Sequence, residues 1–83
     1  MGTLMQEYGL TGRDAGFYYR FLSRLITDCR FYLGYGNRCV KHLWAHDTKK
    51  QAALMREVYN ALPAAPEWCS LEMICAFDRA MNS

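Results

Sequence analysis

The sequence lacks the features that mark a membrane or secreted protein. It holds no run of about 18 apolar residues, which a membrane-spanning helix requires. Its N-terminus lacks the basic, apolar and small-residue regions of a secretory signal. Charge of one sign is also scarce, because 10 Lys and Arg stand against 8 Asp and Glu. A net charge of +2 excludes a strongly acidic mimic of DNA and does not by itself indicate nucleic-acid binding. We expect a cytoplasmic protein that makes no membrane contact.

Disulfides and β-strands are not indicated either. The four cysteines are even in number, but disulfide frameworks are typical of secreted chains, so we expect reduced and mostly buried thiols. No segment alternates apolar and polar residues as a half-buried strand does, and no repeat or low-complexity tract occurs. These absences favour one cooperative helical unit. The cysteines are Cys29, Cys39, Cys69 and Cys75.

Apolar side chains, in contrast, are abundant. With 52% hydrophobic and 14% aromatic residues, the chain is too apolar to be intrinsically disordered. We divide it into an N-terminal lead-in at 1–13 and a single helical domain at 14–83. In the lead-in, Leu4, Met5 and Tyr8 predict one apolar face of a short helix.

The longest periodic segment runs from Asp14 to Leu33. Its apolar residues recur at spacings of three and four and fall within roughly 140° around a helix, which predicts an amphipathic helix with a buried stripe. Asp14 can accept hydrogen bonds from free backbone N–H groups, and Gly34 and Gly36 permit the left-handed geometry that ends a helix. The stripe consists of Tyr18, Phe21, Leu22, Leu25, Ile26, Cys29, Tyr32 and Leu33.

Two further helices and a short helical turn complete the expected fold. The turn is expected at 40–44, where Trp44 packs onto the bundle. The next helix opens at Asp47 and Thr48, with Thr48 and Gln51 at capping-box spacing, and ends before Pro63. The last helix begins at the N-cap Ser70. We therefore predict an all-α protein, a compact three- to four-helix bundle. The two core faces are expected to hold Ala52, Met55, Val58, Tyr59 and Leu62, and then Ile74, Phe77 and Met81.

A recognisable motif covers the end of the long helix and the turn after it. It is the run Asp-Cys-Arg-Phe-Tyr-Leu-Gly-Tyr-Gly-Asn-Arg at 28–38, followed by Leu43 and Trp44. On this motif the chain resembles the large polyvalent protein-associated domain family, eleventh type, of phages and conjugative elements. The likeness extends over about 17–81 and departs from the family pattern at Cys69, where an apolar residue is expected.

The resemblance implies a setting for the protein. Members of such families are carried by a phage or another mobile element, and their products help that element to establish itself in a bacterium. Small free-standing products of this kind often bind and block a host defence complex, as anti-CRISPR proteins do. By this analogy we expect a stoichiometric inhibitor in the bacterial cytoplasm, with a CRISPR effector as the first candidate partner.

The outer face of the long helix offers the first candidate binding surface. Arg13, Arg20 and Arg24 fall within about 40° of one another, opposite the buried stripe, and Phe31 projects near them. Arginines pair with carboxylates or phosphates, and an aromatic ring adds apolar contact or stacking. The plainer alternative is a solvated helix face with Phe31 covered by the N-terminal segment. Phe31 and Leu54 are also exposed apolar candidates for a homodimer contact.

The turn after the long helix offers a second patch, formed by Tyr35, Asn37 and Arg38. Two glycines in the turn would let backbone amides point at an anion, and the Asn37 and Arg38 side chains would add donors. The plainer alternative is a helix C-cap and a tight turn in which Tyr35 packs.

A metal site is the third candidate. Cys39, His42 and His46 have spacings that place them on one side of a helix, and Cys29 or Cys75 would complete a tetrahedral Zn²⁺ site. No Cys-x-x-Cys pair is present, however, and Cys29 belongs to the apolar stripe. We expect no metal and no other cofactor, and a zinc-stabilised structural module stays as an alternative.

Catalysis is not indicated. A cysteine nucleophile needs a histidine to activate it and a third group to orient that histidine, and only Cys39 and His42 come near this arrangement. We therefore expect a binding protein and not an enzyme. The other alternative is a small nucleic-acid-binding module, in which the same arginines neutralise phosphates and Phe31 or Tyr35 stacks on a base.

Overall fold

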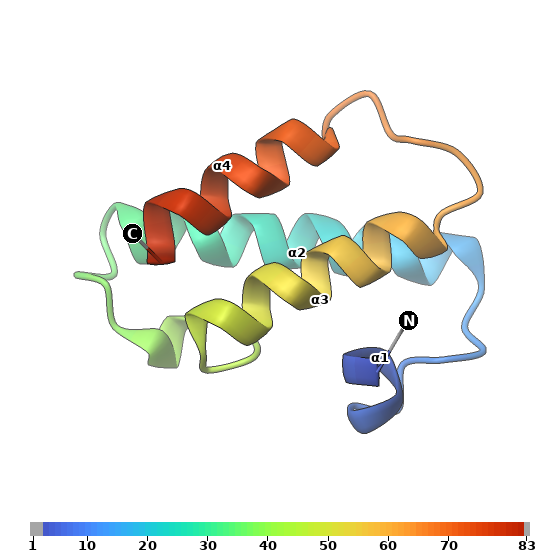
Figure 1. The fold of residues 1–83 in the computed structure, drawn as a ribbon, viewed down its shortest axis with the longest axis horizontal. Helices are drawn as coiled ribbons and strands as arrows, with labels where there is room; N and C mark the ends of the chain where they lie inside the picture. Colours follow the sequence, from blue (N-terminus) through green and yellow to red (C-terminus); the bar gives the residue numbers. More distant parts are fainter. Residues whose placement is uncertain (1–2, 83) are drawn as a thin grey trace.

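Helices account for all the regular structure in the part of the chain that the computed structural model describes, residues 3–82 (Figure 1). Residues 1–2 and 83, at the outer ends of the expected segments 1–13 and 14–83, lie outside the described residues. The prediction of an all-α helical bundle is confirmed. No helix in the described part is long and apolar enough to cross a bilayer. The elements are α1 (Thr3–Glu7), α2 (Ala15–Leu33), the 3₁₀ turn η1 (Val40–His42), α3 (Thr48–Ala61) and α4 (Leu71–Asn82).

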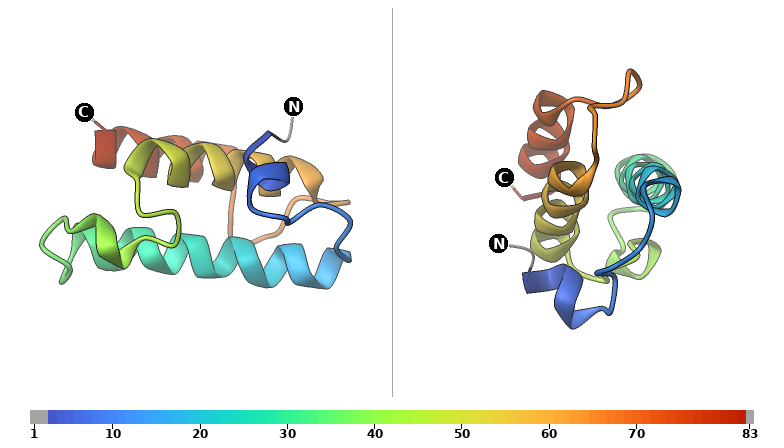
Figure 2. Two further views of the ribbon diagram at one scale, coloured as in Figure 1. Left: turned by 90° about the horizontal axis from the view of Figure 1, so that it is seen from below. Right: turned by 90° about the vertical axis from the view of Figure 1, so that its right-hand side faces the viewer.

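The helix α3 is the central element of the bundle. It contacts α4, α2 and α1, and Figure 2 shows α2 on one side of the molecule with α3 and α4 together on the other. The buried side chains of all these elements meet in one core. Its members are Met5, Leu10, Tyr18, Leu22, Leu25, Ile26, Cys29, Tyr32, Leu43, Ala52, Leu54, Met55, Val58, Cys69, Ile74 and Met81.

The N-terminal segment is fastened to the bundle by hydrogen bonds from both sides. The Glu57 carboxylate of α3 accepts from the backbone N–H of Leu4 at 3.3 Å and of Met5 at 3.0 Å. The Tyr18 hydroxyl of α2 donates to the Leu10 carbonyl at 2.7 Å. Met5 and Leu10 are thereby held in the core, so this segment contributes to the domain's packing.

The boundaries of α2 follow the predicted signals. The Asp14 side chain accepts from the Phe17 N–H at 2.7 Å, as expected of an N-cap. At the other end the Gly34 N–H donates to the Arg30 carbonyl at 3.0 Å. The apolar stripe is buried as predicted, except that Phe21 and Leu33 are only half-buried.

The role expected for the two glycines after α2 is wrong. Gly34 has a φ of −102°, and the left-handed residues of the turn are Asn37 and Arg38, with φ of 53° and 56°. At position 36 a glycine is needed because there is no room for a side chain. A Cβ at this position would lie 2.8 Å from His42 Cδ2, because the turn folds back against the imidazole.

The predicted capping box at the start of α3 is also wrong. Asp47 is the N-cap, and its side chain accepts from the Lys50 N–H at 2.8 Å. The Thr48 hydroxyl instead donates to the Asn82 side-chain oxygen at 2.6 Å, which joins α3 to the end of α4. Gln51 does not act as the partner in a capping box and is completely buried.

The connection from α3 to α4 agrees with the prediction. Leu62 is extended, with ψ of 142°, as the residue before Pro63 must be, and α3 ends at Ala61. The Ser70 hydroxyl accepts from the Met73 N–H at 3.2 Å at the start of α4. The connector also places Cys69 in the core, where its thiol packs as a small apolar group.

Candidate partner-binding surface

The outer face of α2 carries a straight row of exposed side chains, which we call the α2 stripe: Arg20, Arg24, Thr27 and Phe31. Their spacings of four, three and four place them on one side of the helix, opposite the buried Leu22. Phe31 is 43% exposed, so the N-terminal segment does not cover it. Thr27 was not singled out from the sequence, although the spacing alone was sufficient to find it.

Arg13 does not belong to the α2 stripe, contrary to the prediction. It precedes the N-cap Asp14, whose extended backbone directs the chain away from the helix axis. The Arg13 guanidinium lies 5.2 Å from the centre of the Phe17 ring, and its backbone N–H donates to the Tyr18 hydroxyl at 3.2 Å. Arg13 therefore lies beside the N-terminal end of α2 in a cation–π contact.

A row of half-buried aromatic rings joins α1, α2 and the segment after η1. Phe17 stacks on Phe21 with centroids 5.6 Å apart, and Phe21 meets Trp44 edge to face at 4.9 Å. Trp44 in turn meets Tyr8 at 4.9 Å. The prediction that Trp44 packs onto the bundle is confirmed. No local pattern indicated that these four rings form one row, because they come from three separate segments.

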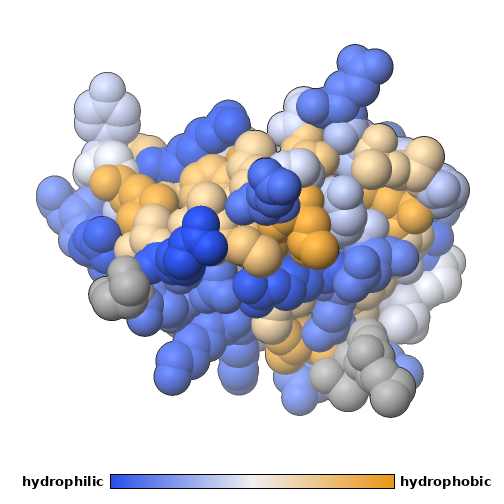
Figure 3. Space-filling view, turned by 45° about the horizontal axis from the view of Figure 1, so that its top comes forward, coloured by the Kyte–Doolittle hydropathy of each residue, from blue (hydrophilic) through white to orange (hydrophobic). Residues whose placement is uncertain are grey.

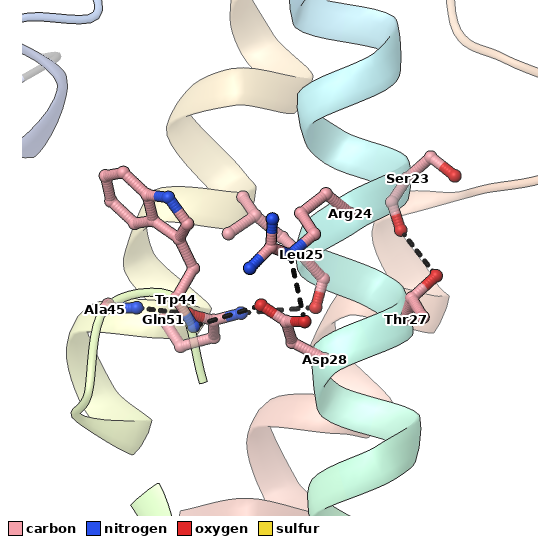
Figure 4. Close-up of polar contacts among 8 residues, drawn as sticks. All are labelled: Ser23, Arg24, Leu25, Thr27, Asp28, Trp44, Ala45 and Gln51. Atoms are coloured by element: carbon pink, nitrogen blue, oxygen red, sulfur yellow. Dashed lines mark hydrogen bonds and ion pairs between the residues drawn. The ribbon is translucent and has the colours of Figure 1, made fainter. Parts of the chain in front are cut away.

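Asp28 connects the α2 stripe to the segment that carries Trp44. One of its carboxylate oxygens lies 3.2 Å from Arg24 Nε, and the other accepts from the Trp44 backbone N–H at 3.0 Å (Figure 4). The Asp28 side chain is only 12% exposed, whereas that of Arg24 is 61% exposed. Arg24 is therefore oriented and partly neutralised by Asp28 while its guanidinium still faces solvent.

Gln51 makes a second connection just beneath Asp28. Its amide oxygen accepts from the Ala45 N–H at 3.0 Å, and its amide nitrogen donates to the Leu25 carbonyl at 3.2 Å (Figure 4). One buried amide thus joins α3, α2 and the chain after η1. Because the side chain is fully buried, both hydrogen bonds are shielded from water.

Three backbone amides of the turn after α2 are already used in hydrogen bonds within the protein. The N–H groups of Gly34 and Gly36 donate to α2 carbonyls, and that of Arg38 donates to the Tyr32 carbonyl at 3.1 Å. The Arg38 guanidinium donates to the Ala80 carbonyl at 3.2 Å, near the end of α4. These hydrogen bonds favour the plainer interpretation, a helix end followed by a tight turn, and Arg38 has a structural contact.

Tyr35 is the most prominent side chain of the second patch. It is 89% exposed and follows Phe31 by four residues, just beyond the end of α2. The Phe31 ring meets the His42 ring edge to face, with centroids 4.7 Å apart. One side of the Phe31 ring therefore packs on His42, while the rest of the ring is exposed. Asn37 is exposed in the same turn. Two exposed aromatic side chains, Phe31 and Tyr35, therefore stand at and just beyond the C-terminal end of α2.

The candidate metal ligands do not converge. Cys39 precedes η1, His42 contacts Phe31, and His46 lies in a later turn with a φ of 56°. Within residues 3–82, no three Cys, His, Asp or Glu side chains are arranged to hold a metal ion. The proposed fourth ligand Cys29 is fully buried. The geometry of the described residues therefore gives the zinc alternative no support.

The four cysteines lie in different environments. All four cysteines are free; Cys29 and Cys69 are buried as expected, whereas Cys39 is exposed. Burial raises the pKa of the Cys29 thiol to about 12, so this group stays protonated and unreactive at neutral pH.

The prediction of an exposed Leu54 is wrong, because Leu54 faces the core with no exposed surface.

The similarity of this chain to known proteins lies in one domain family. No match to this chain exists among curated proteins or among solved structures. The family described as "Large polyvalent protein-associated domain 11" matches residues 15–81. This span begins with the first residue of α2, ends one residue before the end of α4, and includes the whole α2 stripe. The chain belongs to the large polyvalent protein-associated domain 11 family.

Proposed function

We propose that this protein acts by binding another protein through the α2 stripe and Tyr35. The observation that carries the proposal is the row of exposed arginine and aromatic side chains on α2, followed by Tyr35 just beyond its end; Phe31 is 43% and Tyr35 89% exposed. Arginine and tyrosine are enriched among the residues that dominate binding energy at protein interfaces. From Arg20 to Phe31 the stripe extends for about 16 Å along α2, a length suited to a groove on a partner.

Two features favour a protein partner over nucleic acid. The positive charge along α2 is not continuous, because Arg24 shares its charge with Asp28 at 3.2 Å. Arg38 is bonded to a carbonyl near the end of α4. A phosphate backbone is bound best by a run of free cations, whereas a protein interface needs only a few arginines around an apolar centre. Phe31 and Tyr35, at the C-terminal end of the stripe, supply the apolar contact area.

The proposed partner is a protein complex of the bacterial host's defence against mobile elements, with a CRISPR effector as the first candidate. This part of the proposal rests on the family, which is expected in phages and conjugative elements, and on analogy. A domain of 9.6 kDa that binds stoichiometrically needs no catalytic step. Inhibition would follow from covering a surface that the effector uses for its target or for its own assembly.

The experiment combines affinity capture with a phage protection assay. Tagged wild-type protein is incubated with nuclease-treated lysate of the host, and captured proteins are identified. The same protein is expressed in cells whose CRISPR system blocks a phage, and plaques are counted. We expect a defence component to be captured at moderate salt and plaque numbers to rise with expression.

The test variant is Arg20→Glu with Arg24→Glu, and the matched control is Lys49→Glu with Lys50→Glu on α3. All four positions are exposed, but Glu at position 24 would stand beside the Asp28 carboxylate, so circular dichroism checks the fold and Arg20→Glu alone is tested in parallel. The first variant should lose capture and phage rescue, and the control should keep both. A different outcome would overturn the proposal: a partner that is captured only when nuclease is omitted, and whose capture falls steeply as salt rises. That result would establish nucleic-acid binding.

A further inference from the structure

The outer face of α4 carries an open groove that the proposed function does not use. The groove has a volume of about 430 Å³ and is lined by Leu71, Glu72, Cys75 and Arg79. Leu71 is 44% exposed although it is a large apolar side chain. Figure 3 shows a band of apolar side chains across the face to which α4 contributes, with hydrophilic side chains along its borders and at points across it. Such a band, bordered by hydrophilic side chains, is typical of a contact surface.

The charged residues of the groove are arranged symmetrically. Glu72 and Arg79 are seven residues apart, which is two turns, and therefore lie on the same side of α4. Halfway between them stand two small residues, the partly exposed Cys75 and the exposed Ala76. Within residues 3–82, neither Glu72 nor Arg79 has an ion-pair partner. This face of α4 thus carries an acidic side chain at one end, small side chains in the middle and a basic side chain at the other end.

The neighbouring charges do not disturb this pattern. Arg56 of α3 lies beside the groove, but its guanidinium is 2.8 Å from the Asp78 carboxylate and 3.6 Å from the Cys75 sulfur. The pair Arg56 and Asp78 is therefore neutral as a unit. The groove presents one unpaired acid and one unpaired base to whatever covers it.

We propose that α4 packs against α4 of a second copy of this chain in an antiparallel, two-fold symmetric dimer. A two-fold axis between Cys75 and Ala76 places each Glu72 opposite Arg79 of the other copy, so that the contact forms two equivalent ion pairs. A parallel pair would place Glu72 against Glu72 and Arg79 against Arg79. The charge order therefore selects the antiparallel arrangement.

The side chains along the axis fit this contact. Cys75 and Ala76 are small enough for two helices to approach to about 8 Å. The helix has 12 residues and is only about 18 Å long, so the interface is small and the dimer dissociates readily on dilution.

The test is sedimentation velocity of the purified protein in reducing buffer over a hundredfold range of concentration. Four proteins are compared: wild type, Arg79→Glu, Glu72→Arg, and the double exchange Glu72→Arg with Arg79→Glu. We expect wild type to form dimers as concentration rises. Each single variant creates two like-charge contacts and should weaken association at least tenfold, and the double exchange should restore it to within threefold of wild type.

The control Lys49→Glu makes the same change of charge on α3 and should leave association unchanged. Circular dichroism and thermal unfolding confirm that all variants keep the fold. Wild type that stays monomeric up to millimolar concentration overturns the proposal. So does a dimer that the single variants do not weaken, or a double exchange that associates no better than the singles. Because only purified chain is used, these results are independent of any foreign partner.

Discussion

Replacement of Gln51 by glutamate tests the buried amide that joins α2, α3 and the segment after η1. The substitution keeps the size of the side chain and replaces the amide nitrogen, which donates to the Leu25 carbonyl at 3.2 Å, with a carboxylate oxygen. Two oxygens with lone pairs then face each other at a site with no solvent exposure. Burial raises the pKa of a carboxyl group, because the charged form loses its hydration.

The expected magnitude follows from this pKa. If the folded protein raises the pKa of the introduced carboxyl by two to three units, the cost at pH 7 is about 3 to 4 kcal/mol. That is a large part of the roughly 4 to 12 kcal/mol expected for a domain of 83 residues. Protonation lets the carboxyl donate to the Leu25 carbonyl, so the cost is complete above the raised pKa and disappears as pH falls toward about 4.

Urea denaturation between pH 4 and 8, followed by circular dichroism, measures this difference from wild type. The control is the same substitution at the exposed Gln6 of α1, which should shift the free energy of unfolding by less than about 0.5 kcal/mol at every pH. A Gln51→Glu protein whose loss of stability is small and does not change with pH would refute the buried bridge.

Three further predictions concern the core, the thiols and the acid range. Leu54→Ala should lower the free energy of unfolding by about 2 to 5 kcal/mol in urea denaturation; a change below about 1 kcal/mol would mean that this side chain is exposed after all. Iodoacetamide at pH 8, read by peptide mass spectrometry, should alkylate Cys39 quickly and Cys29 only after unfolding, and rapid labelling of Cys29 in the native state would contradict its burial. The Arg56 side chain hydrogen-bonds to the Asp78 carboxylate and holds the pKa of Asp78 below 3.8, so this carboxylate stabilises the fold above its unfolded pKa and the contribution is lost as pH falls through the lower, folded value. As pH falls, wild type should therefore lose up to about 1 kcal/mol more of its free energy of unfolding than Asp78→Asn does, measured by urea denaturation at each pH. Equal losses in the two proteins would count against the ion pair.

Local signals in the sequence predicted the helices well. The periodic stripe of α2, its N-cap Asp14 and the N-cap Ser70 of α4 are each confirmed by buried side chains or hydrogen bonds. These features depend on residues a few positions apart, so the pattern of a single segment is sufficient to find them. The end of α3 before Pro63 is of the same kind.

Features that depend on contacts between segments were missed. Gln51 lies within the predicted core face of α3, but its burial was not predicted because its side chain is polar. Leu54 lies about 40° outside that face, and it is buried because three other helices cover α3 and widen its buried sector. The Asp28 carboxylate was not singled out, because its partner Trp44 N–H is 16 residues away and becomes a neighbour only after the turn closes. Arg20 and Phe31 of the candidate surface were predicted because they lie on a regular helix. Arg13 was misplaced because it lies before the cap.

The central claim is that the α2 stripe and Tyr35 bind the partner, and the dissociation constant of the complex tests it most directly. Calorimetric titration of the captured defence protein would compare wild type with Arg20→Glu plus Tyr35→Ala, and with the matched pair Lys49→Glu plus Trp68→Ala, whose positions are exposed outside the stripe. Loss of two contacts of this kind should weaken binding at least about 30-fold, whereas the matched pair should stay within about threefold of wild type. Equal affinities for all three proteins, or a greater loss in the matched pair, would contradict the claim.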